Sequence, residues 1–284
     1  MHTVGLTWQH SFETASVLAV GGSALALPKN RIARGVGAFA RETAVIGVLY
    51  GVWQLAGRIS VTSGVEPAKR RAQWIQDVER YLPLPSERDT QQAVLGHRLL
   101  IEAANLYYAA MHMTIMLTFL VWLFVRHRDR YRPVRQVMAW TTLGCLLIQL
   151  LPVAPPRMMP GITDTGLALH ESVYSNGLPI DQLSAMPSVH VAWAMIVGYY
   201  TWRISTSRWR YLGPAHAVIT TLVVVITGNH WWLDGIVAVA ILVLCAWGVY
   251  GVRSAWHAAL ARLRTDRGLA EPDGLTPETV GVSP

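Results

Sequence analysis

Two residues in the C-terminal third of the chain have the types and spacing that nucleophilic chemistry requires. His230 and Asp234 lie four residues apart in the segment HWWLD, so on a helix they share one face. A carboxylate in that position holds one imidazole N–H, fixes the tautomer and raises the basicity of the other ring nitrogen. The alternative is that Asp234 only caps a helix N-terminus, where acidic side chains are favoured.

A second histidine belongs to a segment that is typical of a helix start. In PSVH, residues 187–190, Pro187 suits the first helical turn, and the backbone N–H groups of that turn form an anion site. Ser188 adds a hydroxyl donor, and His190 lies close to any anion bound there. The alternative is a capping serine followed by an interfacial histidine.

Arg157 ends the segment APPR, residues 154–157. The paired prolines stop the preceding helix and fix the path of the chain. The planar guanidinium presents two parallel donors, which suits a phosphate; the alternative is a side chain that extends to the lipid headgroups. Asn229, next to His230, is a further candidate substrate contact.

A weaker feature is a polar stripe formed by Asn105, Tyr108 and His112, which have the i, i+3, i+7 spacing of one helix face. These residues are candidate substrate contacts, although hydrogen bonding between helices is the favoured explanation of such a stripe. Nearer the N-terminus, we expect Glu42 and Arg41 to form a local or interhelical charge pair.

Composition indicates the class of protein that holds these groups. Hydrophobic residues make up 52% of the 284 residues and charged residues 14%, against about 25% charged in an average soluble domain. This excludes disorder over most of the length and disfavours a soluble globule. The net charge of +7 does not favour nucleic-acid binding, because the basic residues form short clusters between apolar blocks. Cys145 and Cys245 lie inside apolar blocks and form no metal or disulfide pattern.

The apolar blocks predict an all-α polytopic membrane protein, with six transmembrane helices in a bundle plus an amphipathic interfacial helix. The expected spans cover residues 38–57, 99–125, 134–153, 187–202, 212–228 and 232–250. The first outer loop, 58–98, contains the amphipathic helix at 66–82, for which a plain connecting helix is the equal alternative. Its apolar positions are Trp74, Ile75, Val78, Tyr81 and Leu82.

The flanking segments complete the expected organisation. Residues 1–37 form a cytoplasmic or interfacial N-terminal segment, residues 38–252 the membrane catalytic domain, and residues 253–284 a cytoplasmic tail that is disordered from about 268. Within the first segment, residues 14–27 are expected to lie on the surface or to be disordered, and a signal-like segment is the less favoured alternative.

Orientation follows from Lys and Arg in the loops. Fifteen lie on the side of both termini and eight on the opposite side, which places the termini in the cytoplasm of a cell-membrane protein. The segments that carry Arg157, His190 and His230 then face outward. Polar groups at membrane depth are expensive, so these three clusters are candidates for function.

APPR, PSVH and HWWLD, in this order, resemble the motifs of the type 2 phosphatidic acid phosphatase superfamily over about residues 95–250. The branch that contains inositol phosphorylceramide and sphingomyelin synthases matches better. The resemblance implies that His230 attacks phosphorus and forms a phosphohistidine, that Asp234 orients and charge-balances it, and that His190 protonates the leaving group and then acts as base. It also implies that Arg157 and the amides of residues 188–190 hold the phosphate, with no metal and no cofactor.

The departures from the superfamily pattern favour headgroup transfer over simple hydrolysis. A Lys-x6-Arg-Pro motif is absent, Val224 stands six residues before His230 where the phosphatases have Arg, and Trp231 stands where Tyr is usual. If water is the acceptor, the same chemistry is hydrolysis.

The sequence therefore predicts a lipid phosphotransferase or phosphatase that takes its substrate from the bilayer, with no nucleic-acid partner. Two alternatives stay open. One is a metal-dependent membrane hydrolase with His190, His230 and Asp234 as an N,N,O site, although no HExxH segment or second carboxylate supports it. The other is a non-catalytic lipid-binding membrane protein, in which the polar clusters are helix contacts and caps.

Overall fold

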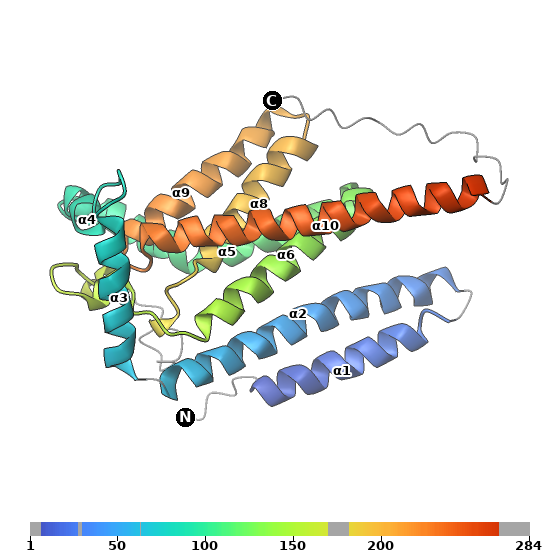
Figure 1. The fold of residues 1–284 in the computed structure, drawn as a ribbon, viewed down its shortest axis with the longest axis horizontal. Helices are drawn as coiled ribbons and strands as arrows, with labels where there is room; N and C mark the ends of the chain where they lie inside the picture. Colours follow the sequence, from blue (N-terminus) through green and yellow to red (C-terminus); the bar gives the residue numbers. More distant parts are fainter. Residues whose placement is uncertain (1–6, 28–29, 63, 170–181, 267–284) are drawn as a thin grey trace.

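The computed structural model describes residues 7–27, 30–62, 64–169 and 182–266, and in these residues the fold is helical without a named strand (Figure 1). The prediction of an all-α protein is confirmed. The α-helices are α1 (Trp8–Ala24), α2 (Arg31–Thr62), α3 (Val65–Glu79), α4 (Glu87–Leu95), α5 (Arg98–Arg126), α6 (Arg128–Gln149), α7 (Thr165–Ala168), α8 (Val189–Ile204), α9 (Leu212–Ile226) and α10 (Trp232–Asp266). Two 3₁₀ turns cover Pro156–Met158 and Arg208–Tyr211.

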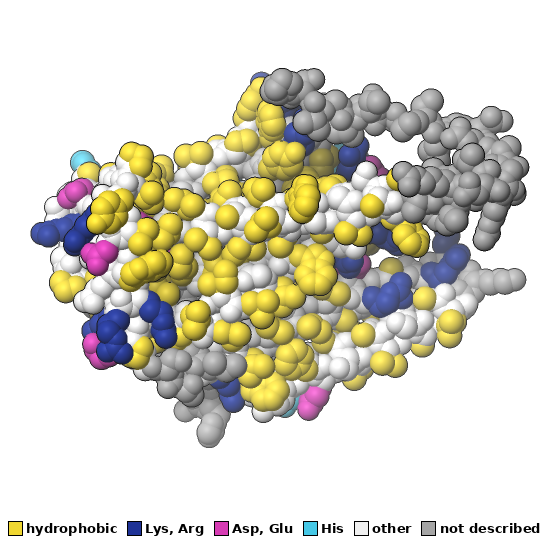
Figure 2. Space-filling model, in the orientation of Figure 1, with side chains coloured by type: hydrophobic (Ala, Val, Ile, Leu, Met, Phe, Trp, Pro, Cys, Tyr) yellow, Lys and Arg dark blue, Asp and Glu magenta, His cyan; other side chains and the backbone are white. Residues whose placement is uncertain are grey.

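Four stretches of the described residues are long and apolar enough to cross a membrane: Arg31–Arg58, Arg98–Arg126, Arg208–Ile226 and Trp232–Trp256. They correspond to the first, second, fifth and sixth expected spans. In Figure 2, hydrophobic side chains cover the middle of the visible face, and Lys and Arg gather towards its two ends. The chain is therefore a membrane protein.

The other two expected spans, the third and the fourth, coincide with α6 and α8. These helices are shorter or less hydrophobic than the four stretches given above. The first eight residues of α6 include four arginines and Asp129, and α8 has only 16 residues. Helix α8 lies among α5, α6, α9 and α10 and buries Val191, Ala192, Ala194, Ile196, Val197, Gly198 and Tyr200. The six-span arrangement stays a prediction.

Helices α1 and α2 form a hairpin along one side of the bundle (Figure 1). Glycines allow the close contact, because a Cβ added to Gly22 would lie 2.7 Å from the Gly37 carbonyl oxygen. The Arg41 Nη1 donates to the Gly22 carbonyl at 2.5 Å. Of the segment 14–27, residues 14–24 are therefore helical and packed against α2, which excludes disorder there.

Helix α3 lies across one end of the bundle, beside the start of α10 (Figure 1). Its buried side chains are Ala68, Ala72, Ile75 and Glu79, which follow helical spacing. Trp74 and Tyr81 are 63% and 90% exposed. The expected helix is present, but only Ile75 of its predicted apolar face is buried, because small alanines form the packed surface. Its place in the leaflet stays a prediction.

The segment after α6 passes between α3 and the segment that leads into α8. Val153 N–H donates to the Leu183 carbonyl at 2.7 Å, and Ala154 N–H donates to the Ala68 carbonyl at 3.2 Å. The Trp231 indole N–H donates to the Ala154 carbonyl at 3.0 Å. These contacts bring the APPR turn, the start of α8 and the start of α10 to the end of the bundle that α3 covers.

The boundaries differ from those expected. Helix α2 begins at Arg31, before residue 38, and α10 runs without a break to Asp266, so the expected boundary at 252 lies inside a helix. The expected disordered tail lies outside the described residues.

Candidate active site

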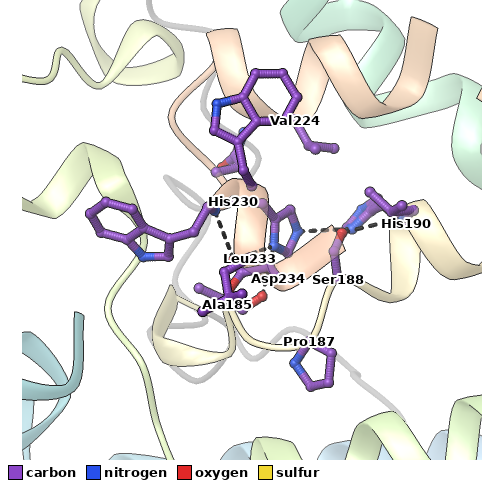
Figure 3. Close-up of polar contacts among 12 residues, drawn as sticks. Ala185, Pro187, Ser188, His190, Val224, His230, Leu233 and Asp234 are labelled. Carbon is purple, nitrogen blue, oxygen red and sulfur yellow. Dashed lines mark hydrogen bonds and ion pairs between the residues drawn. The ribbon is translucent and has the colours of Figure 1, made fainter. Parts of the chain in front are cut away.

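The starts of α8 and α10 bring the two predicted histidines together (Figure 3). His190 is in the first turn of α8, His230 comes two residues before α10, and Asp234 is in the first turn of α10. His230 is 4% and Asp234 0% exposed. Two helix N-termini therefore converge on one buried point.

The hydrogen bonds of His230 define its tautomer. Nδ1 lies 2.7 Å from the Ala185 carbonyl oxygen and 3.3 Å from Asp234 Oδ2. The Ala185 carbonyl oxygen can only accept a hydrogen bond, so Nδ1 carries the hydrogen and Nε2 presents a lone pair. Burial lowers the pKa of His230 to about 4; the Ala185 hydrogen bond opposes this shift and the charge of Arg157 adds to it. The imidazole is therefore neutral near pH 7.

Asp234 combines the two roles that the sequence left open. Its Oδ2 accepts the Trp231 N–H at 2.8 Å, which caps α10, and also faces His230 Nδ1. The shorter contact of Nδ1 is with Ala185. Sequence reasoning missed this partner, because a main-chain carbonyl leaves no side-chain signal.

His190 lies against His230 and is stacked on α5. Its Nδ1 is 3.3 Å from His230 Nε2. The Tyr108 ring stacks on His190 at 4.7 Å, and the His112 ring lies 4.2 Å away and stacks in turn on Trp193 at 4.8 Å. Aromatic contacts therefore fix the orientation of His190.

The three residues of the polar stripe on α5 do not share one role: some lie at the site, as candidate substrate contacts would, and one joins two helices. Tyr108 and His112 lie at the site, where they contact His190. Asn105 instead accepts a hydrogen bond from Thr165 Oγ1 at 2.9 Å, so it joins α5 to α7.

Ser188 is the N-cap of α8. Its Oγ accepts the Val191 N–H at 3.3 Å, and its own N–H donates to the Asp234 carbonyl at 3.2 Å. The side chain is fully buried. Ser188 therefore caps α8, as the alternative interpretation of PSVH predicts. Its backbone N–H links the start of α8 to the start of α10. A contact of the Ser188 hydroxyl with phosphate stays a prediction.

Arg157 points into the protein and not towards lipid headgroups, because it is 9% exposed. Nη1 donates to Asn229 Oδ1 at 2.5 Å, and Nε lies 3.3 Å from Asp164 Oδ2. The Arg157 backbone N–H donates to the carbonyl of Gly228, which adopts φ +69°; a Cβ there would lie 3.1 Å from the Arg157 Cβ. Arg157 and Asn229 thus form one unit beside His230, and sequence reasoning missed Asp164.

A cavity of about 510 Å³ extends from this site between α2, α5 and α6. His190, His230, Arg157 and Asn229 line it, together with mainly apolar side chains. The cavity reaches Tyr131, 18 residues before Gln149 on α6, so its lining spans about 27 Å at 1.5 Å per residue.

The end of the cavity away from the histidines holds a charged pair. Glu42 pairs with Arg135, and the Tyr131 hydroxyl donates to Glu42 at 3.2 Å. The expected charge pair between Glu42 and Arg41 is therefore wrong: Glu42 pairs with Arg135 on α6, and Arg41 donates to the Gly22 carbonyl instead.

The geometry does not favour a metal centre. Among the described residues, no group of three His, Cys, Asp or Glu side chains is arranged to hold an ion. His230 turns Nδ1 to Asp234 and Nε2 to His190, so the three side chains of the N,N,O alternative do not converge on one point.

A family model of the PAP2 superfamily matches residues 73–248, more than half of the chain. The chain belongs to the PAP2 superfamily. The matched region contains the site residues from Asn105 to Asp234, and Glu42 at the far end of the cavity precedes it. Neither curated proteins nor solved structures give a match. Superfamily membership indicates phosphatase or phosphotransferase chemistry.

Proposed function

We propose that this PAP2 superfamily protein is a membrane-embedded lipid phosphotransferase or phosphatase that forms a phosphohistidine on His230. One observation carries the proposal: His230 Nδ1 is held by two acceptors, while Nε2 faces His190 beside the cavity. A nucleophile needs this arrangement, in which one nitrogen is fixed as a donor and the other is a free base.

The first half of the reaction breaks the bond between phosphorus and the leaving oxygen. The Nε2 lone pair attacks phosphorus, the P–O electrons go to the leaving oxygen, and His190, which the bound phosphate anion favours in its protonated form, gives that oxygen a proton. Since His190 Nδ1 lies 3.3 Å from His230 Nε2, the phosphoryl group must enter between the two rings. The phosphorylated imidazole is balanced by Asp234.

The second half returns the protein to its starting state. An acceptor hydroxyl, from water or an alcohol, loses its proton to His190 and attacks phosphorus, and the N–P electrons return to His230 Nε2. Arg157, Asn229 and the first-turn amides of α8 stabilise the phosphate charge in both halves. Ser188 acts in this scheme by holding the start of α8.

The cavity supports a substrate with a hydrocarbon chain. Its volume falls in the range of ligand sites, and its walls towards Glu42 are mainly Val, Ile, Leu and Met side chains. A lipid whose phosphate lies between the histidines can extend its chain along α2 and α6. Exposed aliphatic side chains on these helices suit entry from the bilayer.

The surroundings of Val224 support headgroup transfer, as in the branch that contains inositol phosphorylceramide and sphingomyelin synthases. The Val224 carbonyl accepts the N–H groups of Asn229 and His230, each at 3.0 Å, and its side chain packs with Val191 and Val225. The phosphatases place an Arg at this position; here an apolar cluster takes its place. A site with fewer cations suits a phosphodiester, which carries less charge than a phosphomonoester.

The orientation test uses Tyr81, which is exposed beside α3. We propose that the site faces outward and that both termini are cytoplasmic. Tyr81→Cys in intact cells should react with a membrane-impermeant maleimide, with unsubstituted protein as the control for Cys145 and Cys245. Labelling of Tyr81→Cys only after lysis would reverse the orientation.

The function test compares purified protein, His230→Ala and the exposed-histidine control His97→Ala in mixed micelles. ³²P-labelled phospholipids and lipid phosphates are supplied with alcohol acceptors, and products are separated by chromatography. We expect label in a new lipid, or free phosphate, from the first and third proteins only. Turnover by His230→Ala would exclude the mechanism, and lipid binding without turnover in all three would indicate a lipid-binding protein.

A further inference from the structure

Three consecutive backbone N–H groups at the start of α10 each donate to a different carboxyl group. Trp231 N–H donates to Asp234 Oδ2 at 2.8 Å, Trp232 N–H to Glu87 Oε1 at 3.1 Å, and Leu233 N–H to Glu79 Oε1 at 2.6 Å. The first N–H groups of a helix lack partners within the helix, and one local cap is the common solution. Two additional carboxyl groups here call for an explanation.

The two additional groups come from the segment that covers this end of the bundle. Glu79 is the last residue of α3 and Glu87 the first of α4, 154 and 145 residues away from their partners. They are only 8% and 3% exposed. Burying a carboxyl group away from water is unfavourable. A contribution to folding stability therefore does not explain why two carboxyl groups are buried at this helix end.

The turn that these groups hold also carries the nucleophile and its orienting carboxylate. His230 directly precedes Trp231, and Asp234 directly follows Leu233. A shift of residues 231–233 would change the 3.3 Å contact between His230 Nδ1 and Asp234 Oδ2. Small displacements of reacting groups lower rates strongly.

We propose that Glu79 and Glu87 are positioning residues for the reaction, and that they fix the turn 231–233 so that His230 and Asp234 keep their relative geometry. The proposal rests on the function proposed above. It gives the α3–α4 segment a role in catalysis without contact with substrate.

Charge makes this arrangement sensitive to protonation. Glu79 faces Glu87 of α4 and, on α10, Asp234 and the Leu233 N–H. Burial, followed by a hydrogen bond to Glu87 and its negative charge, raises the pKa of Glu79 to about 9. Near pH 7 Glu79 therefore keeps its proton and donates to Glu87. Ionisation of Glu79 above pH 9 would add a negative charge beside Glu87 and Asp234 at one helix end, which is unfavourable for that arrangement.

The variants separate positioning from mere packing. Glu79→Gln keeps an acceptor for the Leu233 N–H and a donor for Glu87, so it imitates the protonated acid. Glu79→Ala and Glu87→Ala remove the contacts. Asp77→Ala, an exposed carboxylate on the same helix, is the matched control.

Two measurements on the full chain in micelles need no substrate. Hydrogen exchange of residues 231–233 should accelerate at least about tenfold in both Ala variants, and not in Glu79→Gln or Asp77→Ala. In ¹⁵N-histidine-labelled protein, the His230 ring signals, assigned with His230→Ala, should report the Nδ1–H tautomer in unsubstituted protein and Glu79→Gln. They should report a mixture of tautomers in Glu79→Ala. Unchanged exchange and unchanged ring signals in the Ala variants would overturn the proposal.

Turnover gives the third measurement, with ³²P-labelled phosphatidic acid in the same micelles. We expect Glu79→Ala to lose at least about tenfold in kcat with KM nearly constant, because the substrate contacts are intact. Glu79→Gln should keep the pH 7 rate and lose the decline near pH 9. If unsubstituted protein shows no turnover but the exchange and ring signals change as expected, the proposed function fails and the positioning of His230 by Glu79 and Glu87 stands.

Discussion

The two ends of the cavity are built in different ways. At the histidine end, His190, His230, Arg157 and Asn229 each have an assigned polar or aromatic partner, and the backbone of two helix starts is tied together. At the end that holds Glu42, the walls are mainly aliphatic, and one charged pair joins α2 to α6. Directional contacts fix positions closely, whereas aliphatic walls accept chains of different shape.

The connections of these ends to the bundle differ as well. The histidine end is supported by α3, α4, α5, α8 and α10, through contacts between segments far apart in the sequence. Helix α2 contacts the bundle chiefly through α6, apart from its pairing with α1. We therefore expect substitutions at the first end to change the rate, and substitutions on α2 to change which lipid is used.

The largest effect should come from His190, the proposed acid and base. His190→Asn should lower turnover of a lipid phosphodiester by about 10³, within the range for loss of a general acid–base group. A lipid phosphate p-nitrophenyl ester needs no protonation of its leaving group, so its burst of p-nitrophenolate should be largely retained. Equal losses on the two substrates would mean that His190 has another role. His97→Ala is the control for loss of an exposed imidazole.

The second prediction uses the pKa of His230. The nucleophile is the unprotonated imidazole, and a pKa lowered to about 4 keeps it unprotonated at lower pH than an ordinary histidine. The p-nitrophenolate burst rate should stay level from pH 7 to pH 5 and fall near pH 4. An exposed histidine would lose about thirtyfold by pH 5. A midpoint near pH 6.5 in stopped-flow measurements would contradict the observed burial.

Arg157→Lys should have the next largest effect. Lysine keeps the positive charge but cannot donate to both Asn229 and Asp164 from a planar fork. We expect kcat/KM to fall by about tenfold while the thermal unfolding midpoint shifts by only a few degrees. Arg88→Lys, at an arginine with no polar site contact among the described residues, is the control. Full activity of Arg157→Lys would remove Arg157 from phosphate binding.

The smallest effect is expected from a substitution on α2, in the aliphatic wall of the cavity. Leu49 lines the cavity on α2, and its neighbour Val48 does not. Leu49→Trp should reduce turnover of long-chain lipids a few-fold relative to short-chain lipids, because the larger ring fills space along the wall. Val48→Trp should leave the ratio unchanged. Chain-length competition assays measure the ratio, and the same shift in both variants would indicate a general effect of α2.

How much of each end of the cavity the sequence predicts depends on how far apart in the chain the contacting residues lie. The contact between His230 and Asp234 and the capping of α8 by Ser188 could be predicted, because the residues of each contact lie within four positions of each other and the motifs are short. Glu79 and Glu87 could not, because their contacts join residues more than 140 positions apart and a charge in a loop segment usually faces solvent. Ala185 was missed for a different reason, since it acts through its main chain.

For the fold, the helical class and four apolar spans follow from composition and block length. The sequence does not predict which residues of α2 face the cavity, because every side of this span is apolar. Only the packing of the helices determines that Leu49 lines the cavity while Val48 does not. Similarly, Ala68 and Ala72 attract no attention as apolar anchors, yet they allow the close approach of α3 that leaves Trp74 outside.

The contact between His190 and His230 has a consequence for discrimination among phosphate compounds. Any phosphate that reaches the nucleophile must first separate His190 from His230, whose rings are joined by the contact between Nδ1 and Nε2, so part of its binding energy is spent before chemistry begins. A lipid recovers that energy from the contacts of its chain with the cavity, whereas a small soluble phosphate ester has no chain to contribute. The protein should thus spare the abundant phosphate metabolites of its surroundings through slow turnover, even where they reach the site at high concentration.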